Sequence, residues 1–289
     1  MRYNYSIGAD PELFLVQKDV PGPQFVSAHD VIPGTKVQPF EVLSGAIQVD
    51  GVSAEFNVNP AMTATEFCSN IRDVLQELQS RVTFAKPDLT LYVAPTAVFD
   101  KKYFSKLPKS AKALGCTPDF SVYTDKPNPP PATKEPFRTG SGHIHVGWTA
   151  GERPNESAHL YDCRQMVRQL DCALYPMSLL WDADKRRREL YGKIGAFRPK
   201  HYGVEYRCLS NAWVADPDLH VWVFNATKHA AEILDDGIEL FDDPVLSACV
   251  SHFLEGKDMN RDGLLELHDH LTSEFSFDPL PSFYHSKEA

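Results

Sequence analysis

The feature that most constrains the fold is the stretch GSGHIHVG at residues 140–147, in which polar and apolar residues alternate. Alternation with a period of two predicts a β-strand, because successive side chains of a strand point to opposite faces. His143 and His145 then share one face, and Ile144 and Val146 share the other. Two neighbouring imidazoles can bind a metal ion or contact an anion, and the flanking glycines indicate a close approach of backbone or ligand. Because the motif is short, a strand edge with two solvated histidines stays open as an alternative.

Carboxylates are expected on one side of a second strand. Residues 3–17 have strand character and contain the segment GADPE at residues 8–12. Asp10 and Glu12 are two residues apart, so both point to the same side of an extended chain. The proline between them keeps Asp10 out of the helical region. Like charges this close repel each other unless a cation lies between them. The alternative is a surface turn with solvated acids.

A predicted hairpin adds a third polar face. Residues 46–60 are expected to form two strands joined by a turn at residues 50–51, an Asp-Gly pair. In the second strand, Glu55 shares a face with Ser53 and Asn57. This face either borders water or lines a polar site.

A basic loop leads into a fourth strand. Residues 191–200 are basic and punctuated by glycine, and residues 202–211 are expected to be extended. In that strand, Glu205 and Arg207 share one face, where they either pair with each other or line a site. Cations of the loop are suited to phosphate oxygens and substrate carboxylates. They are Arg198 and Lys200, to which the strand adds Arg207.

The rest of the chain is predicted to be mainly helical, with helices at residues 63–84, 155–181, 218–234 and 244–255. The first begins with a capping box formed by Thr63 and Glu66. Residues 88–98 are expected to form a strand. Residues 100–138 are expected to be irregular, which is typical of a lid, a substrate loop or disorder. The basic run at residues 185–188 is expected to be a solvated helical face.

Residues 258–269, DMNRDGLLELHD, fit the pattern of an EF-hand calcium loop, with Asp where a bidentate Glu is usual. Binding of Ca²⁺ is one interpretation of this segment. The alternative is that Asp262 caps a helix that begins at Gly263.

Composition excludes several classes of protein. The 289 residues carry a net charge of −10, which argues against general binding of nucleic acids or membrane surfaces. Six scattered cysteines without a Cys-x-x-Cys pair argue against a disulfide framework or a structural zinc site and fit a reducing compartment. The start of the chain has no signal-peptide core, and no apolar run reaches membrane-spanning length. We therefore expect a cytoplasmic protein, whose oligomeric state the sequence does not indicate.

Four predicted strands thus offer acids or imidazoles on one face. These residues are Asp10, Glu12, Glu55, His143, His145 and Glu205. An oxygen-rich cluster with one or two histidines suits Mg²⁺ or Mn²⁺ better than Zn²⁺. With cations close behind, the constellation indicates chemistry in which ATP activates a carboxylate.

These motifs resemble those of one enzyme superfamily. GADPELF at residues 8–14 resembles the acidic strand of glutamine synthetases, in which two acids bind separate metal ions. GHIHVG at residues 142–147 is similar to a strand of glutamate–cysteine ligases, and YGVEYR at residues 202–207 resembles the closing strand of that superfamily. Together with YGKIGAFR at residues 191–198 and LSNAW at residues 209–213, the chain most resembles the bacteriophage-type carboxylate–amine ligases, the second type of amidoligase.

The resemblance spans residues 5–215 and implies an α+β fold, in which a curved antiparallel sheet (a funnel) is flanked by helices and followed by a helical C-terminal segment. It implies a catalytic domain at residues 1–235 and a helical extension packed on it at residues 236–289. The implied metal ligands are Asp10, Glu12, Glu55, His143 and Glu205. The implied nucleotide contacts are His145, Lys193, Arg198 and Lys200. The implied catalytic residues are Arg198, Glu205 and Arg207. Asp50 is left out, because its spacing from Glu55 differs from that of the paired acids in glutamine synthetases.

The expected function is the ATP-dependent joining of a small-molecule or peptide carboxylate to an amine through an acyl phosphate, with Mg²⁺ or Mn²⁺ as the metal. This chemistry needs no nucleophilic side chain, which agrees with the absence of a nucleophile-elbow or Cys/His signature. Two alternatives stay open. One is a metal-dependent hydrolase, and the other is a non-catalytic protein of the same fold that binds a nucleotide or a metal.

Overall fold

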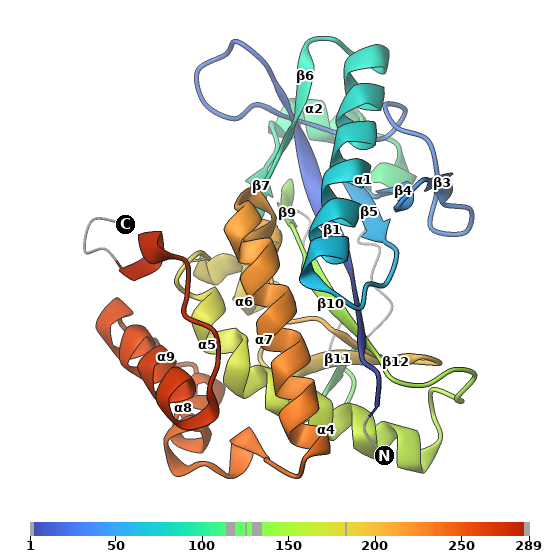
Figure 1. Cartoon of the computed structure of the whole chain (residues 1–289). Helices are drawn as coiled ribbons and strands as arrows, with labels where there is room; N and C mark the ends of the chain where they lie inside the picture. Colours follow the sequence, from blue (N-terminus) through green and yellow to red (C-terminus); the bar gives the residue numbers. More distant parts are fainter. Residues whose placement is uncertain (1–2, 114–118, 125, 129–134, 183, 286–289) are drawn as a thin grey trace.

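A large antiparallel sheet lies at the centre of the computed structural model, which describes residues 3–113, 119–124, 126–128, 135–182 and 184–285 (Figure 1). Ten strands of the described residues form this sheet, in the order β3-β4-β5-β1-β10-β12-β11-β8, and β2 and β6 pair with the C-terminal half of β1. The strands are β1 (Ser6–Gln17), β2 (Phe25–Val26), β3 (Phe40–Val42), β4 (Gly45–Asp50), β5 (Ser53–Val58), β6 (Leu89–Tyr92), β8 (Phe120–Ser121), β10 (Gly142–Gly147), β11 (Ala196–Lys200) and β12 (Gly203–Tyr206). A second, two-stranded sheet contains β7 (Thr96–Val98) and β9 (Phe137–Thr139).

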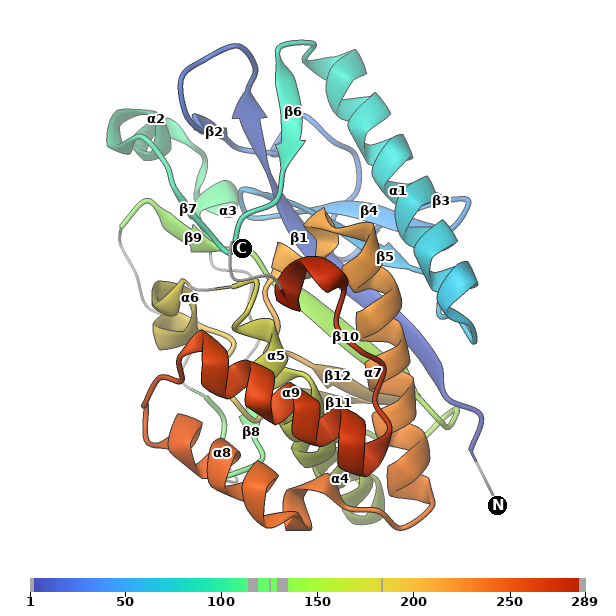
Figure 2. The ribbon, with the colours of Figure 1, turned by 60° about the vertical axis from the view of Figure 1, so that its left-hand side comes forward.

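Three long helices, α1, α4 and α7, cover one face of the sheet. The α-helices are α1 (Ala64–Ala85), α2 (Lys101–Lys106), α3 (Lys109–Lys112), α4 (Ser157–Ala173), α5 (Tyr175–Ser178), α6 (Lys185–Leu190), α7 (Pro217–Asp235), α8 (Pro244–Leu254) and α9 (Arg261–Phe275). The 3₁₀ helices are η1 (Asn211–Ala215), η2 (Leu240–Asp242) and η3 (Ser282–His285). Helices α1, α7 and α4 contact the sheet and each other in that order, and α8 and α9 form an outer layer against α4 and α5 (Figure 2). No helix in the described part of the chain is long and apolar enough to cross a membrane.

The alternation along β1 explains how the two faces of the sheet differ. Ile7, Ala9 and Leu13 are buried in the main hydrophobic core on the side of the helices. Asp10 and Glu12 alternate with them and point to the opposite face. One period-two pattern therefore places apolar side chains under the helices and leaves the carboxylates for a polar site.

The predicted α+β class, with a large antiparallel sheet flanked by helices, is confirmed. The predicted first helix is α1, and Thr63 caps it by accepting a hydrogen bond from Glu66 N at 3.2 Å. The Glu66 carboxylate reaches back to Met62 N at 3.0 Å. The division of the chain at residue 235 stays a prediction.

Several predicted boundaries differ from the structure. The helix expected at residues 155–181 is divided into α4 and α5, because Pro176 has no N–H to continue the hydrogen-bond ladder. The strand expected at residues 88–98 is divided into β6 and β7, with Pro95 between them. The strand after the basic loop ends at Tyr206. The segment at residues 100–138 lies partly outside the described residues, and its described part contains α2, α3, β8 and the start of β9.

The basic run at residues 185–188 is not wholly a solvated face. It forms most of α6, but the Arg187 side chain is fully buried. Arg187 donates hydrogen bonds to the carbonyl oxygens of Cys208 at 2.7 Å and Leu209 at 2.5 Å. Main-chain carbonyls thus replace water around this guanidinium.

The calcium-loop interpretation of residues 258–269 is wrong, because α9 contains most of the motif. The cap of this helix is Asn260, which accepts a hydrogen bond from Gly263 N at 2.9 Å, and not Asp262. An EF-hand loop wraps its ligands around one ion, whereas a helix spreads side chains around its axis.

Candidate functional site

Strand register brings predicted site residues together on the face opposite the helices. Asp10 on β1 pairs with His143 on β10, and His145 pairs with Glu205 on β12. Paired residues of neighbouring strands project from the same face of a sheet. Residues that are more than 130 positions apart in the chain, such as Asp10 and His143, therefore become neighbours.

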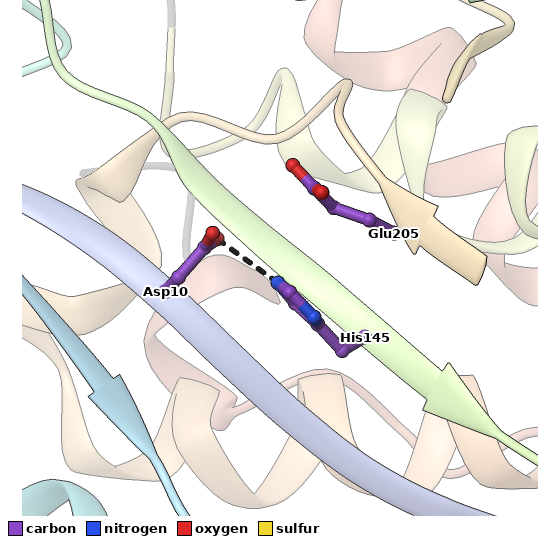
Figure 3. Close-up of side chains that lie close together, drawn as sticks. All are labelled: Asp10, His145 and Glu205. Atoms are coloured by element: carbon purple, nitrogen blue, oxygen red, sulfur yellow. Dashed lines mark ion pairs between the residues drawn. The ribbon is translucent and has the colours of Figure 1, made fainter. Parts of the chain in front are cut away.

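Asp10, His145 and Glu205 form a first group, named here the Asp10 group. Each offers one ligand atom, and these atoms lie within 4.8 Å of one another. His145 Nε2 is 3.2 Å from Asp10 Oδ1 (Figure 3). His143 lies beside them, with its Nδ1 3.1 Å from Asp10 Oδ1 and 3.5 Å from Glu205 Oε1. Oxygen and imidazole donors at this spacing can hold a divalent cation.

Three cations surround the buried Glu205 carboxylate. Lys200 Nζ lies 2.7 Å and Arg198 Nη1 lies 3.3 Å from Glu205 Oε2. Arg207 pairs with Glu205 Oε1, and its Nε lies 3.2 Å from Asp119 Oδ2. Glu205 therefore belongs both to a metal-type group and to a set of side chains that bind anions.

A second group, named here the Glu12 group, contains Glu12, Asp50 and Glu55, whose ligand atoms also lie within 4.8 Å of one another. Glu12 Oε2 accepts a hydrogen bond from Ser141 N at 3.1 Å. Lys36 Nζ lies 2.6 Å from Asp50 Oδ2 and 3.9 Å from Glu55 Oε2. Glu55 Oε2 is buried and accepts no hydrogen bond within the described residues. Three carboxylates thus converge on one small volume.

The protonation states of Asp10 and of the neighbouring His143 suit a metal site. Burial would raise the pKa of Asp10, but the charges of His145 and His143 and their hydrogen bonds hold it well below its usual range. Burial and the charge of Arg207 lower the pKa of His143 to about 4. Asp10 is therefore ionised and His143 neutral near pH 7, which are the states that bind a metal.

In the Glu12 group, the charge of Lys36 does not offset burial and the repulsion between the carboxylates. Burial, together with the charge of Asp50, raises the pKa of Glu12 to about 8. Burial and the charges of Asp10 and Glu12 raise the pKa of Glu55 well above its usual range. A divalent cation between such carboxylates favours their ionised forms.

A cavity of about 620 Å³ adjoins both groups. Asp10 and Glu55 line it, together with Lys36, which precedes β3, and with Arg198 and Lys200 on β11. Its size is typical of sites for small molecules. The cavity combines carboxylates that could hold metal ions with cations that could bind an anionic ligand.

Two tyrosines contact the histidines. Tyr202 OH is hydrogen-bonded to His145 Nδ1, and Tyr191 OH lies 3.4 Å from His143 Nε2. Such partners fix the orientation of an imidazole and are common behind metal-binding histidines.

The glycines beside the histidines allow a close approach of backbone, as the sequence predicted. A Cβ at Gly142 would lie 2.4 Å from Ser210 O and 2.5 Å from Trp213 Nε1. The Trp213 indole N–H donates to the Gly142 carbonyl at 3.1 Å. The strand that carries His143 is thereby anchored to η1.

The structure gathers nine of the ten predicted site residues on the polar face or in contact with it. These are Asp10, Glu12, Glu55, His143, His145, Arg198, Lys200, Glu205 and Arg207. The tenth, Lys193, lines a different cavity of about 660 Å³, with Lys185, Arg188 and Phe253 among its other lining residues.

Four residues of this region lie outside the predicted set, namely Lys36, Asp50, Asp119 and Tyr202. For Asp50 a signal existed. It pairs with Ser53 across a turn formed by residues 51–52, one residue later than predicted, which places Asp50 on the face of Glu55. Lys36 and Asp119 lie outside the strands, where no periodicity indicates where a side chain points.

Residues 133–264 match the model of a family described as phage phiEco32-like COOH.NH2 ligase-type 2. The matched region contains β10, β11 and β12 with their site residues, whereas β1, β4 and β5 precede it. The resemblance predicted from the motifs is therefore confirmed for residues 133–264, which make up less than half of the chain.

Among solved structures, one titled "Crystal structure of novel glutamine synthase homolog" is similar to this chain, with 13% sequence identity and a TM-score of 0.35. The alignment covers 98% of this chain and 70% of that chain. A search of curated protein sequences found no match.

Proposed function

We propose that this chain, whose residues 133–264 match the model of the COOH.NH2 ligase-type 2 family, joins a carboxylate to an amine by means of ATP and an acyl phosphate. The observation that carries this proposal is that the Asp10 group and the Glu12 group adjoin one cavity, which three cations also line. These cations are Lys36, Arg198 and Lys200. The substrates would be a small-molecule or peptide carboxylate and an amine. We expect the reaction to take place in the cytoplasm, that of a host cell if a phage encodes the chain.

The residues present fit Mg²⁺ or Mn²⁺. Carboxylate oxygens dominate both groups, as these hard cations prefer, and Glu55 Oε2 accepts no hydrogen bond among the described residues. In the proposed assignment, Asp10, His143 or His145, and Glu205 hold one ion, and Glu12, Asp50 and Glu55 hold a second. Bound ions would supply positive charge that neutralises the phosphate chain of ATP.

Arg198 and Lys200 are the side chains that we propose to bind the phosphate oxygens. Both line the cavity, and both already contact the Glu205 carboxylate, which is a planar anion. His145 lines the same cavity and would lie next to the phosphates. Lys193 lines the other cavity and is outside this proposal.

The chemistry then follows from charge. The substrate carboxylate attacks the γ-phosphorus, the bond from that phosphorus to ADP breaks, and negative charge moves onto the leaving ADP. Arg198 and Arg207 would stabilise this charge. Contacts with Glu205 and Asp119 fix the Arg207 guanidinium in advance. The amine next displaces phosphate from the acyl phosphate, which requires that water be kept away.

The test is release of ADP and phosphate from ATP with Mg²⁺ across a panel of acids and amines. We expect release only when both an acid and an amine are present. The matched control is Glu205→Gln, which keeps the shape of the side chain and removes its charge. We expect this variant to keep its circular dichroism spectrum and to lose activity by at least about a hundredfold.

Other outcomes would contradict the proposal. A folded Glu205→Gln variant with normal turnover would remove Glu205 from the mechanism. Cleavage of amides or phosphoesters without ATP would favour the hydrolase. A melting temperature that does not respond to ATP·Mg²⁺, in a protein for which no pair stimulates release, would favour a non-catalytic role.

A further inference from the structure

Lys36 places a positive charge inside the Glu12 group. Its ammonium nitrogen is 2.6 Å from Asp50 Oδ2 and 3.9 Å from Glu55 Oε2. The group as a whole presents three carboxylates, since Glu12 lies within 4.8 Å of the other two. Lys36 brings one charge to a place where a divalent ion would bring two.

The main chain around Lys36 is anchored. Thr35 and Gln38 exchange backbone hydrogen bonds of 2.9 and 3.1 Å on either side of it. Gly34 packs onto β4, where its carbonyl accepts a hydrogen bond from Val49 N at 3.2 Å. A Cβ at Gly34 would lie 2.2 Å from Ile47 O, so only glycine permits this contact. With the backbone fixed, the ammonium can change partners by rotation of the side chain alone.

The side chain of Lys36 has a second environment within reach, because it lines the cavity of about 620 Å³. The other cations of that cavity, Arg198 and Lys200, come from β11, which lies several strands away across the sheet. Lys36 therefore faces the cavity from the opposite end of the polar face. A ligand with several anionic groups could contact cations from both ends.

We propose that Lys36 is a displaceable counter-ion, which pairs with carboxylates of the Glu12 group in the absence of metal and moves to the phosphate chain when a divalent ion enters that group. This proposal rests on the proposed function, since it takes ATP as the ligand of the cavity. The metal and the ammonium compete for the same carboxylates, and the phosphates then provide the ammonium with a new partner. Metal binding at the Glu12 group thereby prepares the site for the nucleotide.

The test uses Lys36→Met, which keeps the length of the side chain and removes its charge. Mn²⁺ binding is followed by electron paramagnetic resonance, and binding of a Mg²⁺-bound, non-hydrolysable ATP analogue by calorimetry. Because Lys36 competes with metal at the Glu12 group, we expect one of the two Mn²⁺ sites, named here the second Mn²⁺ site, to bind about tenfold more tightly in this variant. We expect the nucleotide analogue to bind about tenfold more weakly. A purely structural lysine would not shift the two affinities in opposite directions.

Lys18→Met is the matched control, because within the described residues Lys18 Nζ donates only to the exposed Pro87 carbonyl, at 2.8 Å, and Lys18 does not line the cavity. We expect both affinities to be unchanged in this variant. If Lys36→Met does not fold, Lys36→Arg replaces it. A guanidinium can pair with two carboxylates at once and should weaken the second Mn²⁺ site.

Three results would overturn the proposal. The first is a Lys36→Met variant whose second site binds Mn²⁺ more weakly than wild type. The second is a Lys36→Met variant that binds the nucleotide analogue as tightly as wild type. The third is an Mn²⁺ affinity of the second site that neither Lys36→Met nor Lys36→Arg changes. None of these measurements needs turnover. A failure of the displacement mechanism can therefore be told apart from a failure of the proposed ligase activity.

Discussion

Two aspartates, Asp10 and Asp171, differ in pKa because of their partners. Asp10 lies between two imidazoles, which hold its pKa low in spite of burial. Asp171 is fully buried and accepts hydrogen bonds from neutral donors, Tyr206 OH at 2.8 Å and Gly195 N at 3.2 Å. Burial raises the pKa of Asp171 to about 7, and the hydrogen bonds offset only part of this effect. Near pH 7, the Asp10 carboxyl group in the site is therefore ionised, whereas the Asp171 carboxyl group in the core is about half protonated.

The pKa of Asp171 leads to a prediction about stability. Because the folded-state pKa lies above the unfolded value of about 4, folding favours the protonated form. This contribution is fully present below about pH 4 and is lost as the pH rises through about 7. We therefore expect wild type to lose stability relative to Asp171→Asn between pH 5 and roughly pH 8. Urea unfolding of both proteins across this range measures the difference, and parallel curves would contradict the assignment.

Arg187 and Lys36 are two residues whose contacts could not be predicted from the sequence. The basic run that contains Arg187 was expected to be solvated, since a buried charge is costly without partners. Its partners are two carbonyl oxygens more than 20 positions away, which no local pattern reveals. The same limit applies to Lys36, whose position depends on how a loop packs against β4.

At the scale of elements, the alternation of polar and apolar residues correctly predicted which side chains share a face of a strand. It predicted the faces of β1, β5 and β10, because a period of two fixes the side on which each residue of a strand lies. It did not predict register, and register decides that Asp10 lies opposite His143. The resemblance to known ligases supplied that grouping before the structure did. Asp50 was left out because its spacing from Glu55 differs from that of the paired acids in glutamine synthetases, but its pairing with Ser53 places it on the face of Glu55.

The packing of β10 against η1 can be tested with Gly142→Ala. The added Cβ would lie 2.4 Å from the Ser210 carbonyl oxygen, so backbone must move. We expect the free energy of unfolding to fall by ~1–3 kcal/mol and binding of ATP·Mg²⁺ to weaken, because His143 is the next residue. Chemical unfolding and calorimetry measure the two effects.

Gly8→Ala is the control for stability. Gly8 lies in the same sheet, and the nearest atoms to an added Cβ are 3.7 Å away, which is ordinary contact. We expect it to unfold like wild type. An equal loss of stability in both variants would show that close packing at Gly142 is not the cause.

At the scale of the whole molecule, the C-terminal helices share one core with the sheet. Tyr175 and Phe253 pack edge to face at 5.3 Å between ring centroids, and Trp222 donates to the Asp278 carbonyl at 3.1 Å. The buried Gln169 side chain accepts from Leu240 N at 2.9 Å. Residues 236–285 therefore cover apolar side chains of α4, α5 and α7.

This shared core leads to a prediction for a chain that ends at residue 235. Removal of the later residues would expose much of α4, α5 and α7 to water, which opposes folding. We expect the shortened chain to aggregate or to lack a cooperative transition. We expect the full chain to unfold in one transition, followed alike by tryptophan fluorescence and circular dichroism. A shortened chain that folds and binds ATP·Mg²⁺ would contradict this description.

The central claim is that the oxygen-rich site activates a carboxylate with ATP, and its most direct test is isotope transfer. The acid that supports ADP release is labelled with ¹⁸O in its carboxyl group, and the phosphate released with its amine partner is examined by mass spectrometry. An acyl phosphate passes one carboxylate oxygen to phosphate in each turnover, so we expect one ¹⁸O per phosphate released. Phosphate without ¹⁸O, from a reaction that still forms the amide, would contradict the claim.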